Sequence, residues 1–286
     1  MTTAGSVGLA PAGPFVLSRS LGRSKVFACA GVLAALNAHA DQIIAWLRYS
    51  PISVWVSNLC GISAVVWLAM AAAIKIGFEG EGEEIRRLDI LVLAATVALS
   101  LVPLSGAPQA GLLLCAIYLF ATSSVATASR RISIVLLSLT GTLIWGRLLL
   151  HSFAGPILAL DSQLVAWLIG SPVNGNVVAF AGRKSEFVIG TGCSSVHNIS
   201  LAIVLWVTAA ALFKITIDRH YVLTGLVMIG VMFALNIARL MVIGFFPDHF
   251  DFLHEGGGAA IFAWAGLLSI ALLVARGVIG AAARQR

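Results

Sequence analysis

The sequence predicts an all-α polytopic membrane protein with about eight transmembrane helices. Of its 286 residues, 59% are hydrophobic and only 10% are charged, whereas about 25% of the residues in a soluble domain are charged. The mean hydropathy is +0.99. The apolar runs are about 17–24 residues long, which suits spanning helices, while the strands of a membrane barrel alternate over about ten residues. This composition excludes a soluble globular enzyme, a disordered chain, a fibrous repeat and a disulfide scaffold.

The expected spans cover most of the chain. In order, they are Val26–Leu47, Ser53–Ile76, Asp89–Leu104, Ala110–Ala128, Ile132–Leu150, Cys193–Phe213, Tyr221–Phe246 and Gly258–Arg276. They make one transmembrane domain over residues 26–276, flanked by tails at residues 1–25 and 277–286. The first span also resembles a signal peptide that would be cleaved after Ala40. Because apolar residues resume at Ile43–Leu47, we expect this span to be retained.

Basic residues divide unequally between the two sides of the expected membrane. One side carries 13 of them: Arg19, Arg23, Lys25, Lys75, Arg86, Arg87, Arg130, Arg131, Lys214, Arg219, Arg276, Arg284 and Arg286. The other side carries Arg48, Arg147, Arg183 and Lys184, and Arg239 lies within a span. Cytoplasmic loops are enriched in Lys and Arg, so we expect both termini in the cytoplasm. The formal net charge of +6 therefore reflects topology, and we expect no nucleic-acid partner.

The longest connection, residues 151–192, is expected outside the cytoplasm between spans five and six. Pro156–Ile169 has apolar residues at helical spacing, which predicts a helix lying on the membrane surface. Pro172–Gly175 has the composition of a turn. Asn176–Phe180 and Glu186–Ile189 are predicted to be short strands. The segment then delivers the chain to Cys193.

Polar residues gather at one face of the membrane. Span six runs from Cys193 to the cytoplasmic side over roughly 31 Å at 1.5 Å per residue, so Cys193 lies at the outer surface. Span seven runs the opposite way, and Arg239 lies roughly 27 Å along it, near the same face. His254 is in the outer loop that follows. Three reactive side chains are thus expected together at the extracytoplasmic surface.

Cys193 is the candidate nucleophile. A thiolate is the reactive form of cysteine, and a helix N-terminus stabilises it through the aligned peptide dipoles. Thr191, Ser194 and Ser195 could each cap this helix end. We interpret Cys29, Cys60 and Cys115, which lie in mid-span, as inert. The cysteine spacing supports neither a metal site nor a disulfide framework, and we expect no cofactor.

Arg239, His254 and two neighbours complete the candidate site. A charged residue inside a span usually marks function, and Asn236 lies on the same helical face as Arg239. Either His254 or His197 could activate the thiol. His197 is four residues after Cys193, on the same face of the predicted helix, and sequence spacing does not choose between the two histidines.

This pattern resembles the exosortase/archaeosortase family of membrane-embedded cysteine transpeptidases. The resemblance rests on Cys193-Ser194, on the Asn-x-x-Arg of Asn236–Arg239, on His254 ahead of the last span, and on the eight-span topology. It covers roughly residues 156–276. The sequence differs from the family pattern at Ser195 and His197, where Gly and Arg are common.

The resemblance implies a catalytic triad of Cys193, Arg239 and His254. It implies that the Cys193 thiolate attacks the scissile carbonyl and forms a thioester, that Arg239 and backbone amides at the start of span six stabilise the oxyanion, and that His254 transfers the proton. The implied substrates are membrane-anchored proteins that end in a short Pro-Glu-Pro-like motif, a transmembrane helix and a basic tail. The implied acceptor is a surface polysaccharide or lipid, and the implied location is the cytoplasmic membrane of a bacterium or archaeon.

Two alternatives stay open from the sequence. The first is a membrane cysteine protease that only hydrolyses its substrate. The second is a transporter or polysaccharide-export subunit, in which Arg239 and His254 bind an anionic substrate. Transporters commonly place polar groups near the bilayer midplane, on broken helices in related halves. Here the polar groups lie at one surface, which favours the enzyme.

Overall fold

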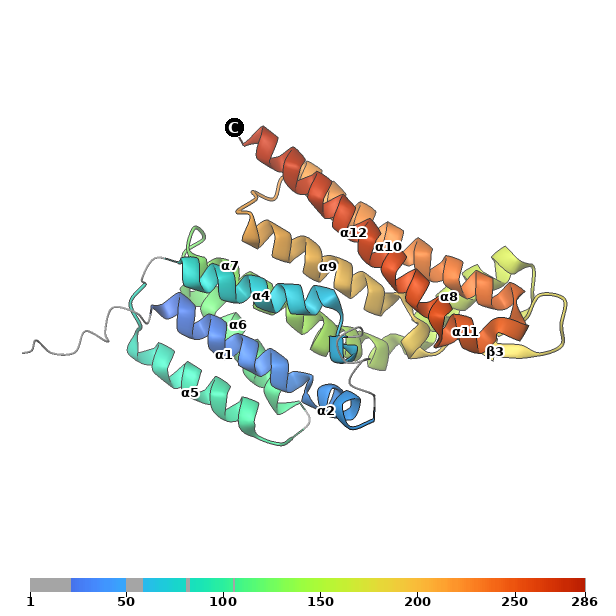
Figure 1. Cartoon of the computed structure of the whole chain (residues 1–286), viewed down its shortest axis with the longest axis horizontal. Coiled ribbons are helices and arrows are strands. Elements are labelled where there is room, and N and C mark those ends of the chain that lie inside the picture. Colours follow the sequence, from blue (N-terminus) through green and yellow to red (C-terminus); the bar gives the residue numbers. More distant parts are fainter. Residues whose placement is uncertain (1–21, 50–58, 81–82, 105, 286) are drawn as a thin grey trace, which may run out of the picture.

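The computed structural model describes residues 22–49, 59–80, 83–104 and 106–285, and most of these are helical (Figure 1). The helices are α1 (Arg23–Ala38), α2 (Ala40–Tyr49), α4 (Ala64–Glu79), α5 (Arg87–Leu101), α6 (Ala107–Thr122), α7 (Ala128–Thr140), α8 (Gly146–Ile169), α9 (Ser195–Leu212), α10 (Arg219–Phe245), α11 (Phe250–His254) and α12 (Gly257–Arg284). Shorter helical turns are η1 (Leu59–Gly61), the π-helical η2 (Gly141–Trp145), η3 (Thr191–Cys193) and η4 (Pro247–His249). The strands β1 (Val173–Asn174), β2 (Val177–Ala179) and β3 (Glu186–Val188) form an antiparallel sheet in that order.

The structure confirms a helical membrane protein. Among the described residues, four stretches are long and apolar enough to cross a membrane: Ala128–Ile169, which comprises α7, η2 and α8, and the helices α9, α10 and α12. The helices α1 and α2 add a fifth if this pair, bent by 54°, is one broken span. The structure thus supports four or five of the eight expected spans. The start of the second expected span, residues 53–58, lies outside the described residues.

The fifth expected span and the helix that follows it are joined in the structure. We expected the span to end at Leu150 and a separate helix to begin at Pro156, but α8 runs through both positions. The backbone leaves helical geometry at Phe153, with φ −129° and ψ 22°. A proline ring clashes with the carbonyl four residues earlier, so this local opening lets Pro156 remain inside α8.

Part of each predicted tail is helical: α1 begins at Arg23 and α12 ends at Arg284. Arg23 lies in α1 and is only 1% exposed, because its guanidinium Nε donates to Asp89 at 3.0 Å and Nη1 contacts Glu83 at 3.4 Å. At the other end, α12 continues to Arg284, which donates to Asp218 at the start of α10 with Nε at 2.9 Å. These ion pairs extend α1 and α12 beyond the boundaries that hydropathy predicted.

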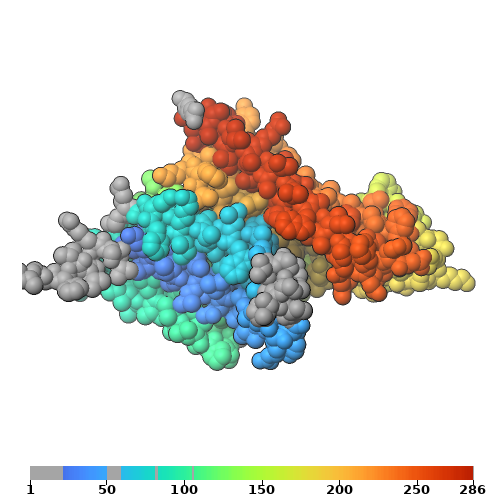
Figure 2. All heavy atoms as spheres, in the orientation of Figure 1, coloured from blue at the N-terminus to red at the C-terminus, as the bar shows by residue number. Residues whose placement is uncertain are grey.

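The hydrophobic core has two main parts. The larger part fills the bundle of α1, α4, α6, α7 and α9, around side chains such as Phe27, Ile76 and Leu136. The second lies between α8, α10, α11 and the sheet, and includes Val165 and Phe187. The first residues of α1 and the last of α12 lie towards one end of the molecule, and the sheet and α11 lie at the other, where they extend beyond the bundle (Figures 1 and 2). The second part of the core supports the candidate site.

Candidate active site

Cys193 lies directly before α9. It is the last residue of the turn η3, and Ser194 caps the helix by accepting a hydrogen bond from the Val196 N–H at 3.3 Å. The sequence predicted that the helix begins at Cys193. In the structure it begins two residues later, at Ser195. The thiol nevertheless lies at the N-terminal end of α9, where the helix dipole favours negative charge.

The sulfur of Cys193 contacts a histidine. Its Sγ lies 3.1 Å from Nε2 of His254, the last residue of α11. Cys193 is 8% exposed and the His254 side chain is 29% exposed. The other ring nitrogen, Nδ1, lies 3.5 Å from Oε1 of the exposed Glu255. A thiol and an imidazole at this distance can exchange a proton, which is the requirement for an activated cysteine nucleophile.

Aromatic packing fixes the His254 ring. Phe250, one turn earlier in α11, stacks on it with the ring centres 5.1 Å apart. Phe250 in turn packs edge-on against Phe180, which follows β2, and Phe180 contacts Phe187 of β3. The sheet therefore supports the imidazole through two layers of rings. Sequence reasoning did not assign these phenylalanines to the site.

Glycines allow the chain to turn sharply after His254. A Cβ atom on Gly256 would lie 2.9 Å from the Cα of Phe252, and one on Gly258 would lie 3.0 Å from the Cα of Leu253. Such approaches to backbone atoms exclude larger residues. The start of α12 can therefore lie directly against α11, which holds His254 in place.

Arg239 contacts the same segment from α10. Its guanidinium donates from Nε to the carbonyl oxygen of Leu253 at 3.3 Å and from Nη2 to that of His254 at 2.7 Å. These bonds use two of the five N–H donors of the group. In this structure Arg239 therefore holds the histidine segment, and it has donors left for a substrate.

Asn236, one turn before Arg239, contacts the cysteine side of the site. Its amide Nδ2 donates to the Cys193 carbonyl oxygen at 2.9 Å, and its Oδ1 accepts from Nδ2 of Asn198 at 3.2 Å. Asn236 is buried. One face of α10 thus positions both the thiol and the histidine.

Asp161 is a buried residue of the site that sequence reasoning missed. This α8 carboxylate accepts from the Ser195 N–H at 3.3 Å and from the Ser195 hydroxyl at 3.1 Å. The sequence assigned the apolar side of this helix, with Leu160 and Trp167, to the membrane surface. The structure buries the opposite side, with Asp161 and Val165, while Trp167 is 76% exposed. A lone Asp on the polar side was the available signal.

The backbone N–H groups of Cys193, Ser194, Ser195 and Val196 each have an acceptor. The N–H of Cys193 donates to Gly190, that of Ser194 to Thr191, that of Ser195 to Asp161 and that of Val196 to the Ser194 hydroxyl. The resemblance implied that amides at the start of this helix would stabilise an oxyanion. In the structure they have other acceptors, which leaves Arg239 as the group with spare donors beside the cysteine–histidine pair.

A clamp joins the tip of the sheet to the turn before α11. Arg183, between β2 and β3, forms two hydrogen bonds with the carboxylate of Asp248 at 2.8 and 2.6 Å. The Arg183 guanidinium holds the pKa of Asp248 below its usual range. The Ala181 N–H also donates to the Gly244 carbonyl at 3.0 Å. These contacts anchor the sheet that supports His254.

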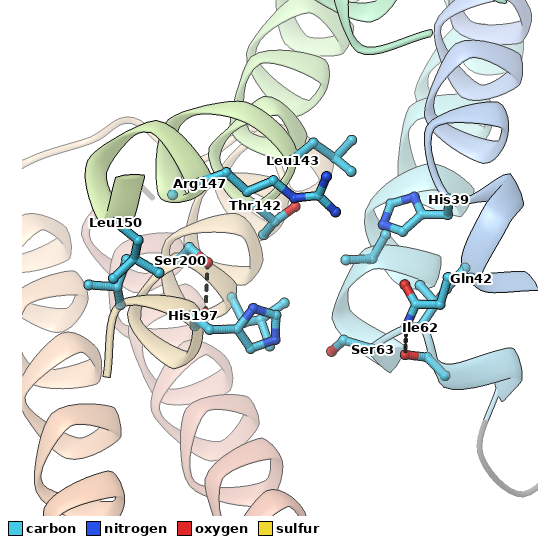
Figure 3. A pocket seen from close by; sticks show the side chains of 15 residues that line it. His39, Gln42, Ile62, Ser63, Thr142, Leu143, Arg147, Leu150, His197 and Ser200 are labelled. Atoms are coloured by element: carbon cyan, nitrogen blue, oxygen red, sulfur yellow. Dashed lines mark hydrogen bonds between the residues drawn. The ribbon is translucent and has the colours of Figure 1, made fainter. Parts of the chain in front are cut away.

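His197, the other candidate base, lies apart from the thiol. Its ring lines a cavity together with His39 and Arg147, and Cys193 does not line that cavity (Figure 3). The remaining cysteines, Cys29, Cys60 and Cys115, are free and lie away from the site. Within the described ranges, no group of three or more His, Cys, Asp or Glu side chains is arranged to hold a metal ion.

Comparisons with known proteins give no match: no family model, no curated protein and no solved structure is significantly similar to this chain. The function is therefore argued from the site itself.

Proposed function

We propose that the protein is a membrane cysteine peptidase that acts as a protein-sorting transpeptidase of the exosortase type. The observation that carries the proposal is the 3.1 Å contact between the Cys193 sulfur and His254 Nε2. A thiol needs an adjacent base and a positively polarised site to become a nucleophile. The imidazole supplies the base, and the start of α9 supplies the polarisation.

The reaction proceeds by acyl transfer. His254 takes the thiol proton as the Cys193 sulfur attacks the scissile carbonyl, and Arg239 donates its spare N–H groups to the resulting oxyanion. The C–N bond then breaks, and His254 protonates the leaving amine. The thioester is resolved by the nucleophile of an acceptor, or by water, whose proton passes to His254.

The proposal includes the topology. We infer about eight spans, both termini in the cytoplasm, and a site on the extracytoplasmic face of a bacterial or archaeal cytoplasmic membrane. Support comes from the basic residues of the expected cytoplasmic loops. It also comes from the position of the site, at the end of the molecule opposite the start of α1 and the end of α12 (Figure 1). The substrate is a membrane-anchored protein with a C-terminal sorting signal, whose scissile bond just outside its helix meets Cys193. The acceptor is a surface polysaccharide or lipid.

Co-expression with a tagged candidate substrate tests the proposal. We expect Cys193→Ala and Cys193→Ser to abolish the shortening of the substrate, while Cys29→Ala leaves it unchanged. The mass of the new C-terminus distinguishes transfer, which adds the acceptor, from hydrolysis, which leaves a free acid. Undiminished processing by Cys193→Ala rejects Cys193 as the nucleophile and with it the proposed enzyme. No shortening of the substrate by the parent chain favours the transporter, in which no covalent product forms.

A further inference from the structure

A polar cavity lies on the side of α9 that faces away from the cysteine–histidine pair. This polar chamber has a volume of about 230 Å³ and lies between the α1–α2 junction, η1, the start of α8 and the first turns of α9 (Figure 3). Its polar lining consists of His39, Gln42, Ser63, Thr142, Arg147, His197 and Ser200. Neither the proposed chemistry nor the packing of the site uses these side chains.

The polar chamber is suited to an anion. Arg147 and His39 extend into it from opposite sides, and the His197 ring lies below them (Figure 3). His39 uses Nδ1 to contact the Ala35 carbonyl at 2.9 Å, so Nε2 is left for a ligand. The described residues lining the chamber include no Asp or Glu, and within the described chain the Arg147 guanidinium has no hydrogen-bonded partner. A guanidinium with a free planar fork is the side chain best matched to phosphate or carboxylate.

An apolar groove lies beside the polar chamber. It has a volume of about 460 Å³, runs between η2, α8 and α9, and shares Gly146, Val196 and Ser200 with the chamber. Large apolar side chains line it, among them Trp145, Leu149, Phe153, Ile199 and Ile203. The polar and apolar volumes are therefore adjacent, and these three residues line both.

The π-helical turn η2 creates the junction between the two volumes. Thr142 and Leu143 of this turn line the polar chamber, whereas Gly141 and Trp145 line the apolar groove. A single π-helical turn displaces side chains from the regular helical pattern and is frequent at functional sites. In this chain it turns adjacent residues of one span towards two different environments.

We propose that the polar chamber and the apolar groove form one binding site for an anionic phospholipid. The phosphate head group lies in the chamber, beside Arg147 and the two histidines, and an acyl chain lies in the groove along α9. A soluble anion would leave the apolar groove unfilled, and an uncharged lipid would leave the Arg147 guanidinium without a charged partner. An anionic phospholipid satisfies both. The site goes beyond the proposed peptidase function and does not depend on it.

Lipid binding to the purified full chain tests the assignment. Native mass spectrometry in detergent gives the affinity for dioleoyl phosphatidylglycerol and for dioleoyl phosphatidylcholine. We expect phosphatidylglycerol to bind about tenfold more tightly, and Arg147→Gln to remove that preference, because one charge-assisted contact is worth about this factor. Ile203→Trp, which fills the groove, lowers binding of both lipids.

Matched controls separate the site from general effects. Arg48→Gln removes another arginine from the expected outer side, and Ile261→Trp enlarges an exposed apolar residue of α12; neither residue lines the chamber or groove. Equal losses for Arg147→Gln and Arg48→Gln overturn the assignment. A second result would also overturn the assignment: soluble glycerol phosphate competes with the lipid, and Ile203→Trp does not change the binding of glycerol phosphate or of the lipid. The chamber would then bind a free anion without using the groove. Thermal unfolding checks that each variant is folded.

Discussion

Replacing Arg239 by methionine separates two roles of this residue, holding the histidine and stabilising an oxyanion. Methionine keeps an unbranched side chain but has no donor, so the hydrogen bonds to the Leu253 and His254 carbonyls are lost. Arg239→Lys retains the charge and can reach one carbonyl at a time. If Arg239 positions His254, both substitutions alter the thiol even without substrate.

The expected size of the effect follows from those two hydrogen bonds. A hydrogen bond to a charged group contributes about 1.5–3 kcal/mol, and we take about 1.5 kcal/mol for each because the guanidinium is half-buried. Together they favour the observed place of His254 by about 3 kcal/mol, or about a hundredfold. The stacking on Phe250 remains and offsets about 1 kcal/mol of this, which leaves a net effect of about 2 kcal/mol, or about a thirtyfold loss of paired thiol.

Alkylation of Cys193 measures this effect directly. Cys29, Cys60 and Cys115 are replaced by alanine, so that iodoacetamide reports on one thiol, and the rate is followed at pH 7. We expect Arg239→Met to slow alkylation about thirtyfold and Arg239→Lys to slow it less. A His254→Ala variant sets the lower limit of the rate.

The control is Arg284→Met, which removes an exposed guanidinium that contacts Asp218 before the start of α10 and not the histidine. It is expected to leave alkylation within about twofold of the parent. The reasoning is refuted if Arg239→Met alkylates at the parent rate while substrate processing is lost. Arg239 then acts on the reacting carbonyl alone, and the histidine segment is held by its aromatic contacts.

Three further perturbations test the supporting structure. Asp161→Ala leaves the buried Ser195 N–H and hydroxyl without their acceptor, so we expect a loss of about 2–3 kcal/mol in thermal unfolding; an unchanged midpoint contradicts the contact. Asp89→Ala leaves the buried Arg23 with Glu83 as its remaining ion-pair partner, and we expect the free energy of unfolding to fall by about 3–5 kcal/mol. Equal stability of variant and parent would contradict this. Because its arginine partner lowers the pKa of Asp248, this pair stabilises the fold above about pH 4, the usual Asp range, and the contribution is lost as the pH falls through the folded pKa. Asp248→Asn should therefore make unfolding less dependent on pH in acid, and parallel profiles would contradict this.

Sequence reasoning could bring Cys193, Arg239 and His254 to one end of the molecule because helix length and charge placement fix the side of each residue. It could not choose between His254 and His197. That choice depends on how η4, α11 and the glycines after His254 fold back over α9, which no helical spacing encodes. The four-residue spacing was misleading, because Cys193 precedes α9 and so does not share a helical face with His197.

The same limit explains why Asp161 and the π-helical turn were missed. Hydropathy finds the apolar side of a helix and assumes that this side is buried, which holds in water. In a membrane the apolar side can face lipid, and the polar side then faces the protein. In α8, Trp167 is exposed while Asp161 is buried, so the functional residues lie on the side that hydropathy regards as the surface.

The start of α9 connects these observations. Cys193 and Asn198 contact α10 and α11, while Val196, His197 and Ser200 line the polar chamber on the other side. Because the helix is rigid over this turn, a ligand in the chamber and a substrate at the thiol contact opposite sides of one structural unit. Asp161 and Asn236 hold this unit from α8 and α10. Its position is therefore fixed by buried polar contacts, which are directional, and not by apolar packing alone, which tolerates small displacements. A site that keeps a sulfur and an imidazole 3.1 Å apart requires that directionality.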